Sequence, residues 1–205
     1  MSIENMQLVS FVLDNSASVS KEKLSALMGG FRRLAAEADR YPTLEWELLC
    51  FDSFAPTVIK SFDSAEILPV RAGRMPLLGR AMQCAAERLS ARAEALTKEG
   101  NNPYRPWLFV LSDGFTFDEP AAAATMLDAW EKQGKVAYLP FRISQQLHND
   151  RMQAMDRVKH MITVKDGGID RFFDFFTTLL ARRAEAGNEG ALKFSKNDFE
   201  GWAEL

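Results

Sequence analysis

The stretch from Gln7 to Ser18, QLVSFVLDNSAS, constrains the fold of this chain more than any other. A run of mostly apolar and β-prone residues stops at Asp14, which two spaced hydroxyls follow. A run of this length that ends in turn-forming residues predicts a buried strand, with Asp14 on the loop at its carboxyl end. If this strand pairs on both sides, it occupies the centre of a sheet.

The spacing of the polar residues in this loop predicts a cation site. Asp14, Ser16 and Ser18 occupy alternate positions, and alternate positions of an extended loop face the same way. In an open α/β sheet, ligands bind beyond the carboxyl ends of the strands. One carboxylate and two hydroxyls at such a place are hard oxygen ligands, which suit Mg²⁺ or Mn²⁺.

A second motif, Leu111–Gly114 (LSDG), ends another apolar run about a hundred residues later. Together with the D-x-S-x-S loop, it resembles the metal-ion-dependent adhesion site of von Willebrand factor A (VWA) domains. The resemblance extends over roughly Met6 to Leu180, and small stand-alone bacterial VWA proteins of the tellurite-resistance type look most similar. It implies a three-layer α/β/α Rossmann-like fold with a mostly parallel sheet. It also implies that Asp113 joins Asp14, Ser16 and Ser18 at the metal, and that another protein binds this face through an acidic side chain.

One segment departs from the family pattern. VWA sites take a threonine from a loop before a helix, and the matching segment here is Ala72–Gly79, with Met75 at the threonine's position. A thioether is a soft, weak ligand that does not replace a hydroxyl toward Mg²⁺. Arg71 or Arg74 could instead place a guanidinium against Asp14 and Asp113, which would give a salt-bridged site without metal. Both interpretations stay open at this stage.

Strand and helix patterns alternate along the chain, which predicts a doubly covered sheet. Six strands are expected, at 7–14, Leu44–Phe51, Thr57–Phe62, Trp107–Leu111, Lys135–Ile143 and Val158–Val164. The short join between the second and third strands requires an antiparallel pair, because a parallel crossover needs a dozen or more residues. Pro140 should pair on one side only.

Several helices are predicted between these strands. The first begins at a serine cap, Ser20, and its Gly29-Gly30 pair predicts either close helix–sheet contact or a kink. The helix from Pro76 to about Thr97 carries a charged face that we expect to be solvated. Its charged residues are Arg80, Glu87, Arg88, Arg92 and Glu94. The helix Ile169–Leu180 carries four phenylalanines that should pack on the sheet.

Two short aromatic segments allow more than one interpretation. Phe115-Thr116-Phe117-Asp118-Glu119 follows the second motif and forms either an interaction rim or core anchors with a charge pair at a helix start. The aromatic residues of Phe194–Trp202 either fold back or bind a partner. We expect a VWA-like domain over residues 1–181 and a charged tail over 182–205, with Ala184–Gly190 mobile.

Composition excludes several partners. A net charge of −3 gives no general attraction to nucleic acid or to anionic membranes. The N-terminus lacks a signal-peptide pattern, and no stretch reaches the roughly 18 apolar residues that span a bilayer. We therefore expect a cytoplasmic protein. Cys50 and Cys84 have no metal-ligand or C-x-x-C spacing, so both should be free thiols.

These observations favour a non-enzymatic protein-binding module in a bacterial stress-response or defence system, as the resemblance implies. A metal-independent scaffold with a degenerate site is the first alternative. A metal-dependent phosphoryl-transfer enzyme is the second, but a dehalogenase-like phosphatase needs an aspartate where Ser16 stands. The P-loop, G-x-G-x-x-G and G-x-S-x-G motifs are absent.

Overall fold

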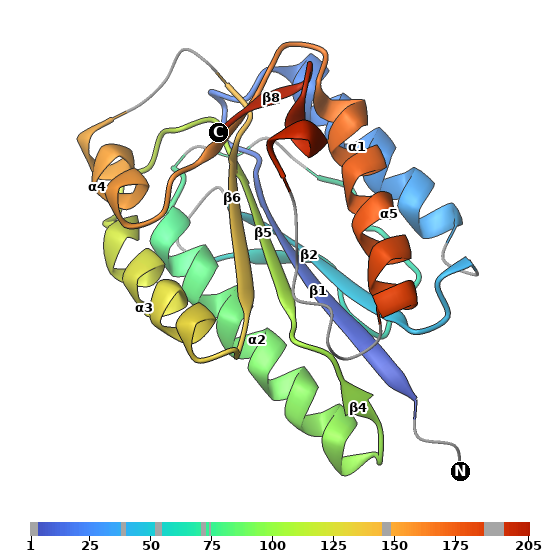
Figure 1. Cartoon of the computed structure of the whole chain (residues 1–205). Helices are drawn as coiled ribbons and strands as arrows, with labels where there is room; N and C mark the ends of the chain where they lie inside the picture. Colours follow the sequence, from blue (N-terminus) through green and yellow to red (C-terminus); the bar gives the residue numbers. More distant parts are fainter. Residues whose placement is uncertain are drawn as a thin grey trace.

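One central sheet with helices on both faces forms the protein (Figure 1). The computed structural model describes residues 4–37, 40–51, 55–70, 73, 75–144, 149–186 and 195–205. Within them the sheet has eight strands in the order β3-β2-β1-β5-β6-β7-β8, and β4 pairs with the start of β1. The strands are β1 (Asn5–Asp14), β2 (Leu44–Phe51), β3 (Thr57–Lys60), β4 (Asn102–Pro103), β5 (Trp107–Ser112), β6 (Ala137–Arg142), β7 (Ile162–Val164) and β8 (Ala203–Glu204).

The predicted fold class and the central place of the first strand are confirmed. β1 pairs in parallel with β2 on one side and β5 on the other, and every one of its residues after Asn5 is buried. β3 is the predicted antiparallel strand beside β2. β4 and β8 were not predicted, because neither two-residue strand has a periodicity that a sequence can display. Pro140 pairs only toward β5, since β7 meets β6 at Phe141 and Arg142.

The helices divide between the two faces as the apolar side chains of alternate strand residues require. The helices are α1 (Lys21–Ala36), α2 (Leu78–Lys98), α3 (Pro120–Lys132), α4 (Asp150–Val158) and α5 (Ile169–Ala186), and a 3-10 turn, η3, spans Lys196–Phe199. α1 and α5 cover one face, and α2, α3 and α4 cover the other (Figure 1). The hydroxyl of Ser20 accepts from the Lys23 amide and caps α1 as predicted. No described helix is long and apolar enough to cross a membrane.

Aromatic rings fill the face under α1 and α5. Phe11 of β1 stacks on Phe109 of β5, with ring centroids 5.3 Å apart, and meets Phe176 of α5 edge-on at 5.1 Å. The predicted packing of the α5 phenylalanines on the sheet is therefore confirmed. Each such pair adds about 0.5–1.5 kcal/mol beyond the burial of its apolar area.

The prediction that the charged face of α2 is solvated is wrong for two of its arginines. Arg88 donates to Glu47 at 2.7 Å and Arg92 donates to Glu45 at 2.7 Å, so both reach the sheet. Glu45 and Glu47 are two residues apart on a strand, and their partners are four residues apart on a helix. Both separations are about 6–7 Å, so the two ion pairs can form side by side. Glu47 is fully buried and also accepts from the Ser10 hydroxyl at 2.8 Å.

The C-terminal segment packs back onto the sheet, which is one of the two outcomes expected for its aromatics. Phe199 and Trp202 are buried against Phe175 of α5, and β8 pairs antiparallel with β7. α5 runs to Ala186, so helix continues through the start of the stretch expected to be mobile. The rest of that stretch, with Phe194, lies outside the described residues.

Gly30 lets α1 and α5 approach each other closely. A Cβ at Gly30 would lie 2.0 Å from the Phe173 ring, whereas a Cβ at Gly29 would meet nothing closer than 3.9 Å. The close contact is therefore between two helices, and the predicted helix–sheet contact is wrong. The error arises because α5 lies over the same face as α1, which spacing along one helix cannot reveal.

Gly30→Ala should destabilise the fold by about 1–3 kcal/mol, because the new methyl group displaces a packed ring. Gly29→Ala is the matched control and should stabilise by up to about 1 kcal/mol through helix propensity. Urea unfolding measures both. Adding Phe173→Leu to Gly30→Ala should restore part of the loss, and equal effects of the two glycine substitutions would contradict the close contact.

Ending the chain after Gly190 tests whether residues 182–205 are a separate tail. We expect the free energy of unfolding to fall by about 3 kcal/mol or more, because Phe199 and Trp202 leave the core. Thermal unfolding of the shortened chain, beside Trp202→Ala in the full chain, measures this. An unchanged midpoint in both would show that the segment contributes no stability.

Candidate functional site

The candidate site begins at Asp14, the last residue of β1. Its side chain is fully buried. One carboxylate oxygen accepts from the Ser16 amide at 2.9 Å. The other accepts from the Ser112 hydroxyl at 3.2 Å and the Asp113 amide at 3.4 Å.

Asp113 lies beside Asp14 because β5 pairs in parallel with β1 and ends at the same edge of the sheet. Its side chain is 1% exposed. Asp113 Oδ1 accepts from the Phe115 amide at 3.0 Å. Asp113 Oδ2 is buried and accepts no hydrogen bond from any described residue. The described part of the site therefore contains one carboxylate oxygen that is shielded from water and has no donor within it.

Burial and like charge together make Asp14 a weak acid. Burial is the larger cause and the charge of Asp113 the second, and they raise the pKa of Asp14 from 3.8 to about 7. The hydrogen bonds from Ser16 and from the Asp113 amide act in the opposite direction and lower it. Near neutral pH, Asp14 therefore exchanges between a protonated and an ionised form.

The two serines lie on the same loop, one inside the site and one at its surface. Ser16 is 2% exposed and its hydroxyl lies 2.9 Å from that of Ser18, which is exposed. Ser16 also forms a bridge with Gly73, whose amide donates to the Asn15 carbonyl at 2.9 Å. The structure thus brings Asp14, Ser16, Ser18 and Asp113 to one edge of the sheet, next to the segment around Gly73.

Met75 follows Gly73 and its side chain is 41% exposed. The two arginines of the salt-bridged alternative, Arg71 and Arg74, lie outside the described residues. No group of three or more His, Cys, Asp and Glu side chains within the described part of the chain is placed to hold a metal. A cation at this site would therefore depend on hydroxyls as well as carboxylates.

Sequence reasoning missed two residues that build this edge. The Ser112 hydroxyl donates to Asp14, a role that the S-D-G motif alone did not predict. Asp118 accepts from the amides of Gly79 and Arg80, at 3.2 and 3.0 Å, and so caps the start of α2 rather than that of α3. In the sequence, Asp118 lies two residues before Pro120, the proline that opens α3. This position suggested a cap for α3 and gave no sign of α2.

The aromatic segment after Asp113 forms a rim. Phe117 is 43% exposed and its amide donates to the Pro76 carbonyl at 2.9 Å, beside Met75. Phe115 is half-buried and meets Phe117 edge-on, with ring centroids 5.0 Å apart. The two alternatives for this segment were a rim and a pair of core anchors. The exposures agree with a rim, because neither ring is buried in the core.

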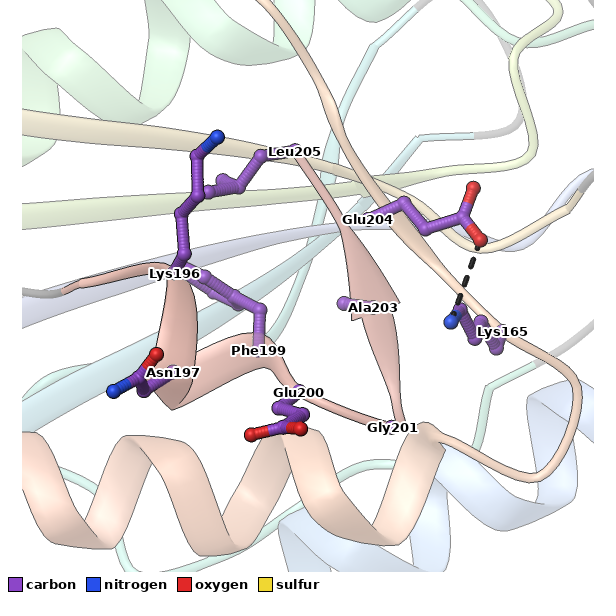
Figure 2. A pocket seen from close by; sticks show the side chains of 9 residues that line it. All are labelled: Lys165, Lys196, Asn197, Phe199, Glu200, Gly201, Ala203, Glu204 and Leu205. Atoms are coloured by element: carbon purple, nitrogen blue, oxygen red, sulfur yellow. Dashed lines mark ion pairs between the residues drawn. The ribbon is translucent and has the colours of Figure 1, made fainter.

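A separate hollow of about 600 Å³ lies in the C-terminal segment (Figure 2). Lys165 and Glu204 form an ion pair at its wall, 3.4 Å apart, and Lys196 and Glu200 extend from η3 and the turn that follows it. None of the four predicted ligands lines this hollow. It is therefore distinct from the candidate site.

Comparison with known proteins identifies the fold. No protein-family model and no curated protein matches the chain. Among solved structures, the SpRpn10 VWA domain matches with a TM-score of 0.52 and 14% identity, over 75% of this chain and 82% of that one. This chain has the fold of a VWA domain. Manganese-loaded TRAP protein from Plasmodium vivax matches with a TM-score of 0.50 and 14% identity, over 76% of this chain and 62% of that one.

Asp113→Asn tests the carboxylate pair in the VWA fold. Because the pKa of Asp14 is raised in the folded protein, the contribution of Asp14 to stability is greatest below about pH 4 and is lost as the pH rises to about 7. Removing the Asp113 charge should lower the pKa of Asp14 and, without metal at about pH 7.5, stabilise the fold by about 1 kcal/mol. Urea unfolding between about pH 4 and pH 8, with EDTA, measures the effect.

Asp128→Asn is the matched control, since Asp128 is a carboxylate of α3 that pairs at the surface with Lys132. Its effect should stay within about 0.5 kcal/mol and should not flatten the pH dependence. A destabilised Asp113→Asn at neutral pH would show that the two carboxylates do not repel each other in the folded protein.

Proposed function

We propose that this protein is a non-enzymatic protein-binding module whose VWA-type site holds Mg²⁺ or Mn²⁺. Asp14, Ser16, Ser18 and Asp113 would hold the ion, directly or through water. A bound divalent ion supplies positive charge and an open coordination position, which attracts a carboxylate. The partner would therefore be a protein that presents an acidic side chain to this edge of the sheet.

The Oδ2 atom of Asp113, which accepts from none of the described residues, carries this proposal. A buried carboxylate oxygen that accepts from none of the described residues is costly, and it lies beside a second buried carboxylate whose pKa is raised. A cation would relieve both the missing hydrogen bond and the repulsion at once. The donor set also fits, because carboxylate and hydroxyl oxygens are the ligands that small hard cations prefer.

The surface around the site suits a protein partner. Ser18 is exposed, so an ion held there can reach solvent or a partner's side chain. Met75 and Phe117 offer apolar contact at the rim, both more than 40% exposed. An acidic side chain would then be bound at the centre, and apolar contacts around it would add affinity.

The wider role follows from the resemblance to small stand-alone VWA proteins of the tellurite-resistance type. It supports partners within a bacterial stress-response or defence system. A manganese-loaded structure among the VWA-fold neighbours is consistent with a divalent ion here, although it is a property of that protein. Met75 supports the competing scaffold, which would bind its partner without metal.

Calorimetric titration with Mg²⁺ and Mn²⁺ at about pH 8 tests the site. The unmodified chain should bind one ion, and binding should raise its stability by about 2.7 kcal/mol at a hundred times the dissociation constant. Asp14→Ala should abolish binding, because the central carboxylate is lost. Met75→Thr should tighten it, because a hydroxyl is a better ligand than a thioether.

Asp128→Ala removes a carboxylate far from the site and should bind the ion like the unmodified chain. Absence of binding in the unmodified chain, with binding only in Met75→Thr, would refute the metal-dependent function and leave the scaffold. Binding that survives Asp14→Ala would place the ion elsewhere.

A further inference from the structure

α2 and α3 start together but end apart, and this leaves a gap in the helical layer. A Cβ at Gly79 of α2 would lie 3.0 Å from the Pro120 backbone, so the first turns of the two helices touch. α2 has 21 residues in all, whereas α3 has only 13. At 1.5 Å per residue, α2 outruns α3 by roughly 12 Å (Figure 1).

A pocket of about 410 Å³ lies where α3 ends. Its position is the amino-terminal edge of the sheet, because Pro106 and Val136, which directly precede β5 and β6, line it. The candidate cation site lies at the opposite edge. Small α2 side chains, including Ala86 and Ala93, leave the space open. Pockets of this size take small organic ligands.

The lining has an apolar interior with one aromatic wall. Leu89 and Val136 are buried, and Trp130 of α3 is half-buried. The other tryptophans, Trp46, Trp107 and Trp202, are all less than 10% exposed. Trp130 therefore offers a stacking surface to a ligand and is the tryptophan best placed to report its binding.

Two side chains of opposite charge line this pocket but do not form an ion pair with each other. Glu94 of α2 and Lys135, next to β6, are both exposed. Neither side chain forms an ion pair or hydrogen bond with any described residue. Arg105, the nearest arginine in sequence to the pocket's Pro106, is occupied by the carbonyls of Glu131 and Val136. The pocket thus offers one anion and one cation to a ligand.

We infer that this pocket binds a free α-amino acid with an aromatic side chain. The ring would stack on Trp130 and fill the apolar interior, the ammonium would pair with Glu94 and the carboxylate with Lys135. A zwitterion with an apolar body matches both the charges and the interior. A simple anion would be repelled by Glu94, and a simple cation would be repelled by Lys135.

Titration of the ¹⁵N-labelled full chain with L-tryptophan tests this inference by nuclear magnetic resonance. Of the four indole N–H signals, that of Trp130 should shift most, and saturably. Tryptamine, which lacks the carboxylate, and indole-3-propionate, which lacks the ammonium, should each bind about tenfold more weakly. Lys135→Ala should reduce L-tryptophan binding to the level of tryptamine.

Ser90→Leu fills the pocket from an exposed position of α2 and should abolish the shift while the signals of the buried tryptophans stay in place. If that variant fails to fold, Ala93→Leu serves the same purpose. No shift of Trp130 at millimolar ligand, equal binding of the three probes, or binding that survives both pocket-filling variants would overturn the inference.

Discussion

Two buried carboxylates lie side by side at the edge of the sheet, and the proposed function depends on this pair. Asp14 and Asp113 end neighbouring parallel strands, so the pairing of β1 with β5 forces them together. Asp14 is fully buried at the end of β1. Backbone amides and the Ser112 hydroxyl offset part of the electrostatic cost, but Asp113 Oδ2 stays without a donor among the described residues.

The rest of the fold holds this pair in place. The aromatic layer under α1 and α5 fixes β1 against β5 through the stacked rings of Phe11 and Phe109. On the other face, Arg88 and Arg92 tie α2 to β2, and Asp118 ties the start of α2 to the loop after Asp113. Interactions on both faces thus restrict how far the carboxylates can separate. A proton on Asp14, or the cation proposed above, relieves their repulsion without moving the strands.

The sequence was most informative for features that depend on residues close together in the chain. The mostly apolar run of β1, the Ser20 cap and the position of Pro140 each depend on a few neighbouring residues, and each prediction agrees with the structure. The grouping of Asp14, Ser16, Ser18 and Asp113 also followed, because parallel strands deliver their carboxyl ends to one edge. Metal binding by these residues remains a proposal.

Features that join distant segments could not be predicted. The contact of Gly30 with Phe173, the burial of Glu47 by Arg88, and the capping of α2 by Asp118 each depend on which helix lies over which strand. β4 and β8 are too short to show a period. Arg71 and Arg74, which decide between a cation and a salt-bridged site, lie outside the described residues.

Proton release on metal binding tests the central claim most directly. Titrating Mn²⁺ in two buffers of different ionisation enthalpy, at about pH 6.5 and about pH 8.5, counts the protons released. Because the pKa of Asp14 is raised to about 7, binding should release most of one proton at the lower pH and almost none at the higher. Binding without proton release at about pH 6.5 would contradict the account, since Asp14 would then already be ionised in the metal-free protein.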